Sequence, residues 1–262
     1  MKVIDPDVTV RPFDDEARER VAALARRQAK ANGLLMQVIN FAGGQVEDGL
    51  KFLPKGTRTQ IETAARKALT RSYEMASRSR TGLPGRVSGD RAHKVLGTIS
   101  GAIGGLGGLP TALAELPVAT TLIFRAVLEV AEAHGEDPLS EETRLECLRV
   151  FGAGGPGAGD DGVDTSFIGA RLTLSGAALN GLISRVAPKF AAVLSQKLAT
   201  QTVPVLGAAA GAGTNYAFVD YYVAMAHVHF GLRAAARDYG EDKVLDHFHK
   251  VLAERRVPVN RA

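Results

Sequence analysis

The chain has 262 residues, of which 45% are hydrophobic and 23% charged, and this balance excludes wholesale disorder. The net charge is +4 and the pI is near 9.3, but the Lys and Arg residues are spread along the chain, which argues against a nucleic-acid partner. The single cysteine, Cys147, excludes an internal disulfide framework. The first residues lack the apolar stretch of a secretory signal, so we expect a cytoplasmic protein.

The N-terminal segment is expected to be extended, because Pro6 and Pro12 limit helix formation. We therefore divide the chain into an N-terminal arm, residues 1–12, and one helical domain, residues 13–262. Acidic residues at 14–16 and basic residues at 26–30 complement the dipole of a first helix, which Gly33 is expected to end or kink. The helix that follows at about 58–77 has a buried stripe formed by Ile61, Ala65, Ala68, Leu69, Tyr73 and Ala76.

A glycine-rich, uncharged stretch covers residues 95–114. Its glycines recur at a four-residue spacing, which leaves bare backbone on one helix face and lets another helix approach closely. Pro117 suits the first turn of the next helix, which is predicted to run to His134 and to stop at Gly135.

The second half of the chain is also predicted to be helical. Ser140 is a candidate N-cap for a helix whose buried stripe is Leu145, Leu148 and Phe151. Further helices are predicted at 165–187, from Pro188 to about 200, from Pro204 to Tyr239, and from Gly240 to Arg255. No segment alternates with period two, so the predicted fold is an all-α, single-domain helical bundle.

Residues 198–219 resemble 95–114 in being uncharged and rich in small residues. We predict that these two stretches pack against each other at the centre of the bundle. Each is near the ~20 residues that a membrane-spanning helix needs, but few large apolar side chains are present. A buried central hairpin is therefore favoured over membrane insertion.

Several of these segments resemble the EcsC family of bacterial proteins, which is named after a protein encoded beside an ABC transporter. The resemblance rests on residues 30–33, 42–44, 114–122, Arg125, 135–137, 148–155, 160–161, 203–207 and 215–221. It implies an α-helical protein with a link to membranes or transport, and it brings no catalytic motif.

Polar residues within the apolar stretches are the first candidates for a site. Glu115, Arg125, Asn215 and Asp220 are predicted to form a structural polar cluster, because buried charges are tolerated when they are paired. In the alternative, Arg125 pairs with Glu129 and faces water. Glu115, Arg125 and Asp220 are also the catalytic candidates, since perturbed carboxylates occur in active sites.

No cofactor or metal ion is expected. His227 and His229, like His247 and His249, are two residues apart on predicted helices and so point to different sides. The acidic residues at 160–164 lack the spacing of a calcium loop, and the glycines at 104–108 lack the Lys of a phosphate-binding loop.

Basic residues on the first two predicted helices offer a surface for anionic lipid headgroups. The candidates are Arg26, Arg27, Lys30, Arg66, Lys67 and Arg71. We therefore expect a non-enzymatic protein that acts at the inner face of the membrane, with an anionic lipid or a membrane transport protein as partner. The alternatives are a hydrolase-like enzyme that uses Glu115 and Asp220, and a soluble scaffold or homodimer.

Overall fold

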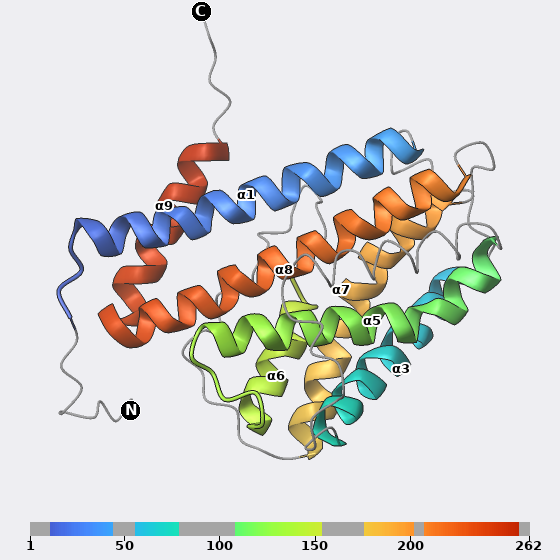
Figure 1. Ribbon diagram of the computed structural model, residues 1–262, viewed down its shortest axis with the longest axis horizontal. Coiled ribbons are helices and arrows are strands. Elements are labelled where there is room, and N and C mark those ends of the chain that lie inside the picture. The colour runs from blue at the N-terminus through green and yellow to red at the C-terminus, as the bar shows by residue number, and fades with distance from the viewer. Residues whose placement is uncertain (1–10, 44–55, 79–107, 154–175, 202–206, 257–262) are drawn as a thin grey trace, which may run out of the picture.

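The computed structural model describes residues 11–43, 56–78, 108–153, 176–201 and 207–256, and within them it contains seven helices and no strand (Figure 1). The predicted all-α fold is confirmed. The helices are α1 (Asp15–Gly43), α3 (Thr57–Arg78), α5 (Gly108–Ala133), α6 (Glu141–Val150), α7 (Gly176–Gln201), α8 (Gly207–Tyr239) and α9 (Glu241–Arg256).

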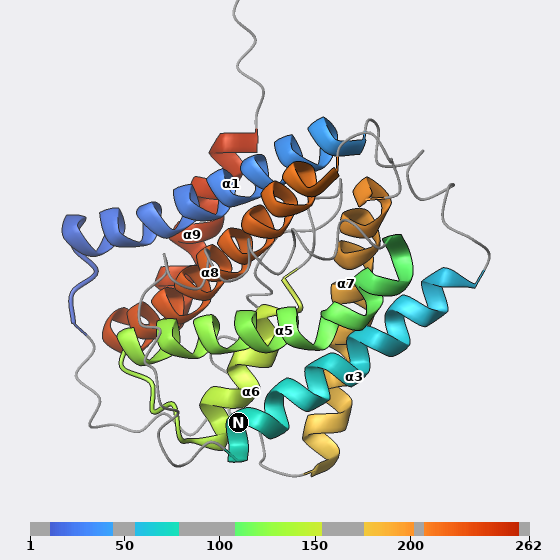
Figure 2. The ribbon, with the colours of Figure 1, turned by 45° about the vertical axis from the view of Figure 1, so that its right-hand side comes forward.

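The two longest helices, α1 and α8, lie side by side, and α9 packs against both of them (Figures 1 and 2). The apolar stripe of α1 includes Val21 and Ala25, which are fully buried. At Gly231 the two helices come close enough that a Cβ atom would lie 2.8 Å from Cδ2 of Leu24. A side chain at this position would therefore require Leu24 to move, and glycine lets α1 lie near α8 with Leu24 in place.

The other side of the bundle is formed by α3, α5 and α7, with the short helix α6 packed against all three. Phe151, which follows α6, lies at the centre of the core. Its ring stacks on Tyr222 of α8 at a centroid distance of 5.1 Å and meets Phe190 of α7 edge-on at 5.2 Å. These aromatic contacts join α6, α7 and α8.

The ends of several helices follow the signals in the sequence. The hydroxyl of Ser140 accepts a hydrogen bond from the Thr143 backbone N–H at 3.0 Å, as expected of an N-cap. Gly135, with φ +83°, ends α5, and the Glu136 N–H donates to the Ala131 carbonyl. Gly240, with φ +90°, separates α8 from α9 in the same left-handed conformation.

The predicted helix boundaries at Pro117 and Pro188 were wrong, and Gly33 does not end the first helix. Helix α1 continues through Gly33 to Gly43, Pro117 lies inside α5 rather than in its first turn, and α7 continues through Pro188. An interior proline costs about 3 kcal/mol in an isolated helix. Contacts with neighbouring helices offset this cost, and Pro188 lies on the exposed side of α7, where water can reach the backbone carbonyl that loses its partner.

The predicted central pair of glycine-rich stretches falls largely outside the described residues. Helices α5 and α8 do pack against each other, but residues 95–107 and the side chains of 207–215 are not described. The close approach of these stretches therefore stays a prediction. Among the described helices, none is both long enough and apolar enough to cross a membrane.

Candidate functional site

A network of ionisable side chains, buried at its centre and exposed at its edge, lies between α6, α8 and the segment after α5. We call it the α6–α8 cluster. Its carboxylates come from the loop after α5 and from α6, and most of its cations come from α8. The members are Glu136, Glu142, Glu146, Arg149, His229, Arg233 and Arg237.

Glu146 is the centre of the α6–α8 cluster, and its side chain is fully buried. One carboxylate oxygen, Oε2, lies 2.8 Å from Nε2 of His229. The other, Oε1, lies 3.0 Å from Nη1 of Arg149 and 3.3 Å from Nη1 of Arg233. These two contacts are at ion-pair distance but lack hydrogen-bond alignment. Glu146 is thus stabilised chiefly by surrounding positive charge.

Arg233 extends the cluster toward the surface. Its Nε lies 3.3 Å from Glu136, and its Nη2 donates to Glu142 at 3.1 Å. Burial by itself would raise the pKa of Glu136, but hydrogen bonds and charges from Arg237 and Arg233 outweigh it and hold this pKa below its ordinary value. Burial would lower the pKa of Arg233, but Glu146 and Glu136 raise it. The ionised carboxylate of Glu136 and the protonated guanidinium of Arg233 therefore stabilise each other.

The α6–α8 cluster contains side chains of the kinds found in active sites, but its central residues are inaccessible to solvent. Glu146 is shielded from solvent, and His229 and Arg149 are buried beside it. The adjacent Cys147 is buried as well, and burial and the Glu146 charge raise the pKa of its thiol well above the ordinary value. A protonated thiol is a poor nucleophile. The cluster therefore acts as a structural tie between α6 and α8.

The two histidines at 227 and 229 lie on different sides of α8, as their spacing predicts. His229 meets Glu146, whereas Nδ1 of His227 lies 3.2 Å from Nε2 of His134 at the end of α5. Partial burial, followed by the charges of Arg27, Arg20 and Arg237, lowers the pKa of His134. Such positive surroundings disfavour a cation at the histidine pair. Across the described helices, no three metal-ligating side chains form a group that could hold a metal ion.

Of the predicted polar cluster, only part can be located. The backbones of Glu115 and Asn215 belong to α5 and α8, but their side chains lie outside the described residues. Arg125 and Asp220 are half-buried on the same two helices. Glu115, Arg125, Asn215 and Asp220 therefore remain a predicted cluster, and a catalytic role for Glu115, Arg125 or Asp220 likewise stays a prediction.

The predicted basic residues lie on two opposite sides of the bundle. Arg26, Arg27 and Lys30 belong to α1, whereas Arg66, Lys67 and Arg71 belong to α3, and both ribbon views place α5 and α8 between these two helices (Figures 1 and 2). The two sets are thus separate surfaces.

Helix α7 adds basic residues to the α3 side. Nη1 of Arg66 donates to the hydroxyl of Ser184 at 3.0 Å, so the exposed edges of α3 and α7 adjoin. Arg185 and Lys189 are exposed on α7, one turn apart. We call these five residues, Arg66, Lys67, Arg71, Arg185 and Lys189, the α3–α7 basic surface.

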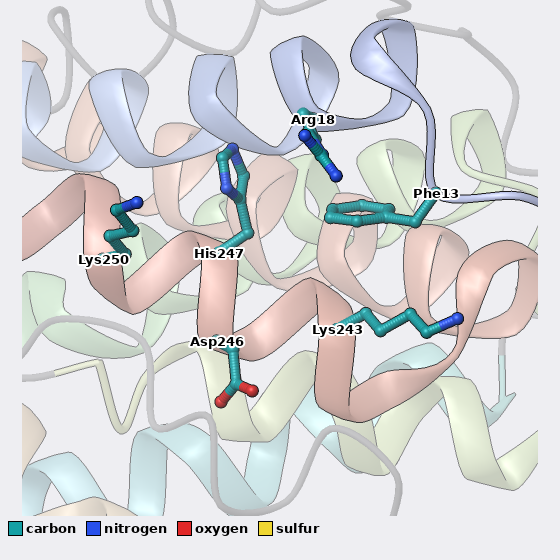
Figure 3. Close-up of a pocket in the computed structure, with 6 residues that line it drawn as sticks. All are labelled: Phe13, Arg18, Lys243, Asp246, His247 and Lys250. Atoms are coloured by element: carbon teal, nitrogen blue, oxygen red, sulfur yellow. The ribbon is translucent and has the colours of Figure 1, made fainter.

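A further surface feature is an open groove between the start of α1 and α9 (Figure 3). Its volume is about 610 Å³, and it is lined by Phe13, Arg18, Lys243, Asp246, His247 and Lys250. We call it the α1–α9 groove. The size is within the range of small-molecule sites, roughly 300–1,000 Å³.

The sequence analysis missed the α6–α8 cluster and the groove. Glu142, Glu146 and Arg149 follow one another at helical spacings of four and three residues. His229, Arg233 and Arg237 follow one another at spacings of four. That spacing is a usable signal for two ionic stripes. It does not reveal that the stripes face each other, because this depends on how α6 docks on α8.

Comparisons with known proteins place the chain in a family without adding an activity. None of the curated proteins and none of the solved structures compared with the chain matches it. The sequence profile of the EcsC protein family matches residues 18–160, which is more than half of the 262 residues. This stretch includes α3, α5 and α6 and most of α1. The chain belongs to the EcsC protein family.

Proposed function

We propose that this protein is a non-enzymatic peripheral membrane protein that binds anionic lipid headgroups through the α3–α7 basic surface. The observation that carries the proposal is the charge imbalance of two adjoining helices. In sequence, α7 contains no Asp or Glu, and α3 contains only Glu62 and Glu74. Basic residues therefore outnumber acidic residues along both helices.

The arrangement of these side chains suits an extended anionic surface better than a single small anion. Lys67 and Arg71 are exposed one turn apart on α3, and Arg185 and Lys189 repeat the spacing on α7. Each Lys or Arg held near an anionic membrane contributes about 1 kcal/mol. A surface with five such residues supports reversible binding without insertion.

An apolar side chain accompanies the cations. Met75 lies one turn after Arg71 on α3 and is 40% exposed, which is high for a large hydrophobic residue. A methionine at the edge of a basic surface can enter the headgroup region while the neighbouring charges stay with the phosphates. This combination supports lipid as the partner.

The α3–α7 basic surface is tested by sedimentation with liposomes. The wild-type protein is mixed with vesicles with and without anionic lipid, at low and physiological salt. We expect co-sedimentation that requires anionic lipid and weakens with salt, because screening reduces the attraction. Protein that stays in the supernatant under every condition would contradict the proposal.

Charge-reversed variants distinguish the two basic sides of the bundle. The test variant is Lys67→Glu with Arg71→Glu on α3, and the matched control is Arg27→Glu with Lys30→Glu on α1. Both change the net charge equally, but we expect only the α3 variant to lose binding. Equal losses would mean that net charge alone drives the association, and a selective loss in the control would move the membrane-binding side to α1.

A further inference from the structure

The α1–α9 groove has a preformed aromatic base. Phe13 precedes α1, and its segment is tied to the end of α8 by a hydrogen bond of 2.8 Å from the Arg11 N–H to the Asp238 carbonyl. The Phe13 ring also packs against Tyr239 at 5.9 Å and meets His247 edge-on at 5.8 Å. These contacts hold Phe13 in place between the two helices.

Three cations, Arg18, Lys243 and Lys250, line the groove that contains this base. The guanidinium carbon of Arg18 lies 5.9 Å from the centre of the Phe13 ring, and Figure 3 shows Arg18 pointing from α1 toward that ring. Lys243 and Lys250 lie on α9, about one turn before and after His247. His247 points up from α9 toward α1, so all four basic groups border the same groove (Figure 3).

The nearby carboxylates offset this charge only in part. Asp246 points away from α1 (Figure 3). Asp14 accepts a hydrogen bond from the Ala17 N–H at 2.9 Å and so serves as the cap of α1. Asp15 pairs with Arg18 at 3.7 Å, but both side chains are largely exposed, and such a pair contributes little. An incoming anion can therefore replace Asp15 as the partner of Arg18.

We propose that the α1–α9 groove binds a small molecule that carries a phosphate monoester. The fork of the Arg18 guanidinium matches two phosphate oxygens, and the two lysines neutralise a dianion from either side. Phe13 supplies an apolar surface for the organic part of the molecule. A ligand of this kind uses both the cations and the aromatic base.

The position of the groove favours a soluble ligand over a lipid headgroup. In both ribbon views α1 and α9 lie on the opposite side of the bundle from α3 (Figures 1 and 2). A protein bound to a membrane through the α3–α7 basic surface would hold the groove away from that membrane. The preference for a soluble ligand therefore rests on the proposed function, whereas the phosphate-binding groove itself does not.

The test is calorimetric titration with inorganic phosphate, glycerol 3-phosphate and phenyl phosphate, with glycerol and phenol as uncharged controls. We expect binding by the phosphates alone, with phenyl phosphate the tightest because its ring can contact Phe13. Arg18→Gln and Lys250→Gln should each weaken binding about tenfold, as for the loss of a charged hydrogen bond. Lys30→Gln, at an exposed position of α1 outside the groove, is the matched control and should leave binding unchanged.

Three results would overturn the proposal. The first is no heat of binding with any phosphate at millimolar concentration. The second is equal weakening in the Lys30→Gln control, which would reflect net charge rather than the groove. The third is binding only to vesicles that contain phosphatidic acid, with loss in Arg18→Gln, which would replace the soluble ligand by a headgroup.

Discussion

The α6–α8 cluster and the α3–α7 basic surface both consist of charged side chains on adjoining helices, but they differ in burial and in balance. In the cluster, Glu146 is fully buried and lies close to Arg149, Arg233 and His229. On the basic surface, Lys67 and Arg71 are exposed and few carboxylates are near in sequence. The buried charges contact one another, whereas the exposed side chains of Lys67 and Arg71 are accessible to a partner.

The two groups of charged residues differ in what their charges contribute. Desolvation makes a buried charge costly unless its partners are fixed, so the α6–α8 cluster contributes to the choice of one docking geometry for α6. An exposed charge stays hydrated, so its desolvation cost is small, and it contributes little to stability. The cluster should therefore respond to substitution through folding, and the surface should respond through binding.

The largest expected effect follows removal of the central carboxylate. Glu146→Leu removes the buried carboxylate that contacts Arg149 and His229 and one of the three carboxylates near Arg233, and we expect a loss of about 3–5 kcal/mol in the free energy of unfolding. Chemical denaturation measures this loss. The control Glu142→Gln alters a carboxylate that also pairs with Arg233 but is 45% exposed, and it should cost less than about 1 kcal/mol. Similar losses in the two variants would show that burial does not set the importance of these charges.

The second prediction separates packing from charge on α8. Gly231 lies between His229 and Arg233 in sequence but contacts Leu24 of α1. Gly231→Leu should cost about 1–3 kcal/mol through overpacking, measured by the same denaturation. Adding Leu24→Ala opens space and should recover part of the loss. If the second substitution recovers no stability, contact with Leu24 of α1 is not the reason that a large side chain at position 231 is destabilising.

The third prediction concerns pH. Because the pKa of His134 is lowered in the folded protein, the unfolded chain binds more protons, and stability should fall as the pH drops below the ordinary value of 6.5. The lowered pKa of Glu136 adds a further loss below about 4.5. His134→Gln should flatten the dependence between pH 7.5 and 5.5, measured by denaturation at each pH. Parallel curves for wild type and variant would assign the acid sensitivity to other groups.

The smallest expected effect on stability is at the basic surface. Lys67→Glu with Arg71→Glu should change the free energy of unfolding by no more than about 0.5 kcal/mol per site, since surface substitutions rarely do more. Thermal unfolding measures this. A large destabilisation would mean that these charges support the fold, and the contrast with the α6–α8 cluster would then fail.

Local signals in the sequence predicted the all-α fold, the Ser140 cap and the glycine ends at Gly135 and Gly240. Each of these depends on one or two neighbouring residues, which is why they could be identified without the structure. The breaks expected at Pro117 and Pro188 were wrong for the opposite reason. From the sequence alone, the cost of a proline inside a helix predicts a break. Tertiary packing stabilises those helices enough to offset that cost.

The sequence by itself determined the helical class, the apolar stripes such as that of Ile61 and Leu69, and the family. Only the tertiary structure decided which charges meet. Glu146 and His229 are separated by 82 intervening positions, and Arg66 and Ser184 by 117, so no local spacing relates them. The helical repeat determines which face of its own helix a residue occupies. How the helices dock then determines whether that face is buried against a partner or exposed to solvent.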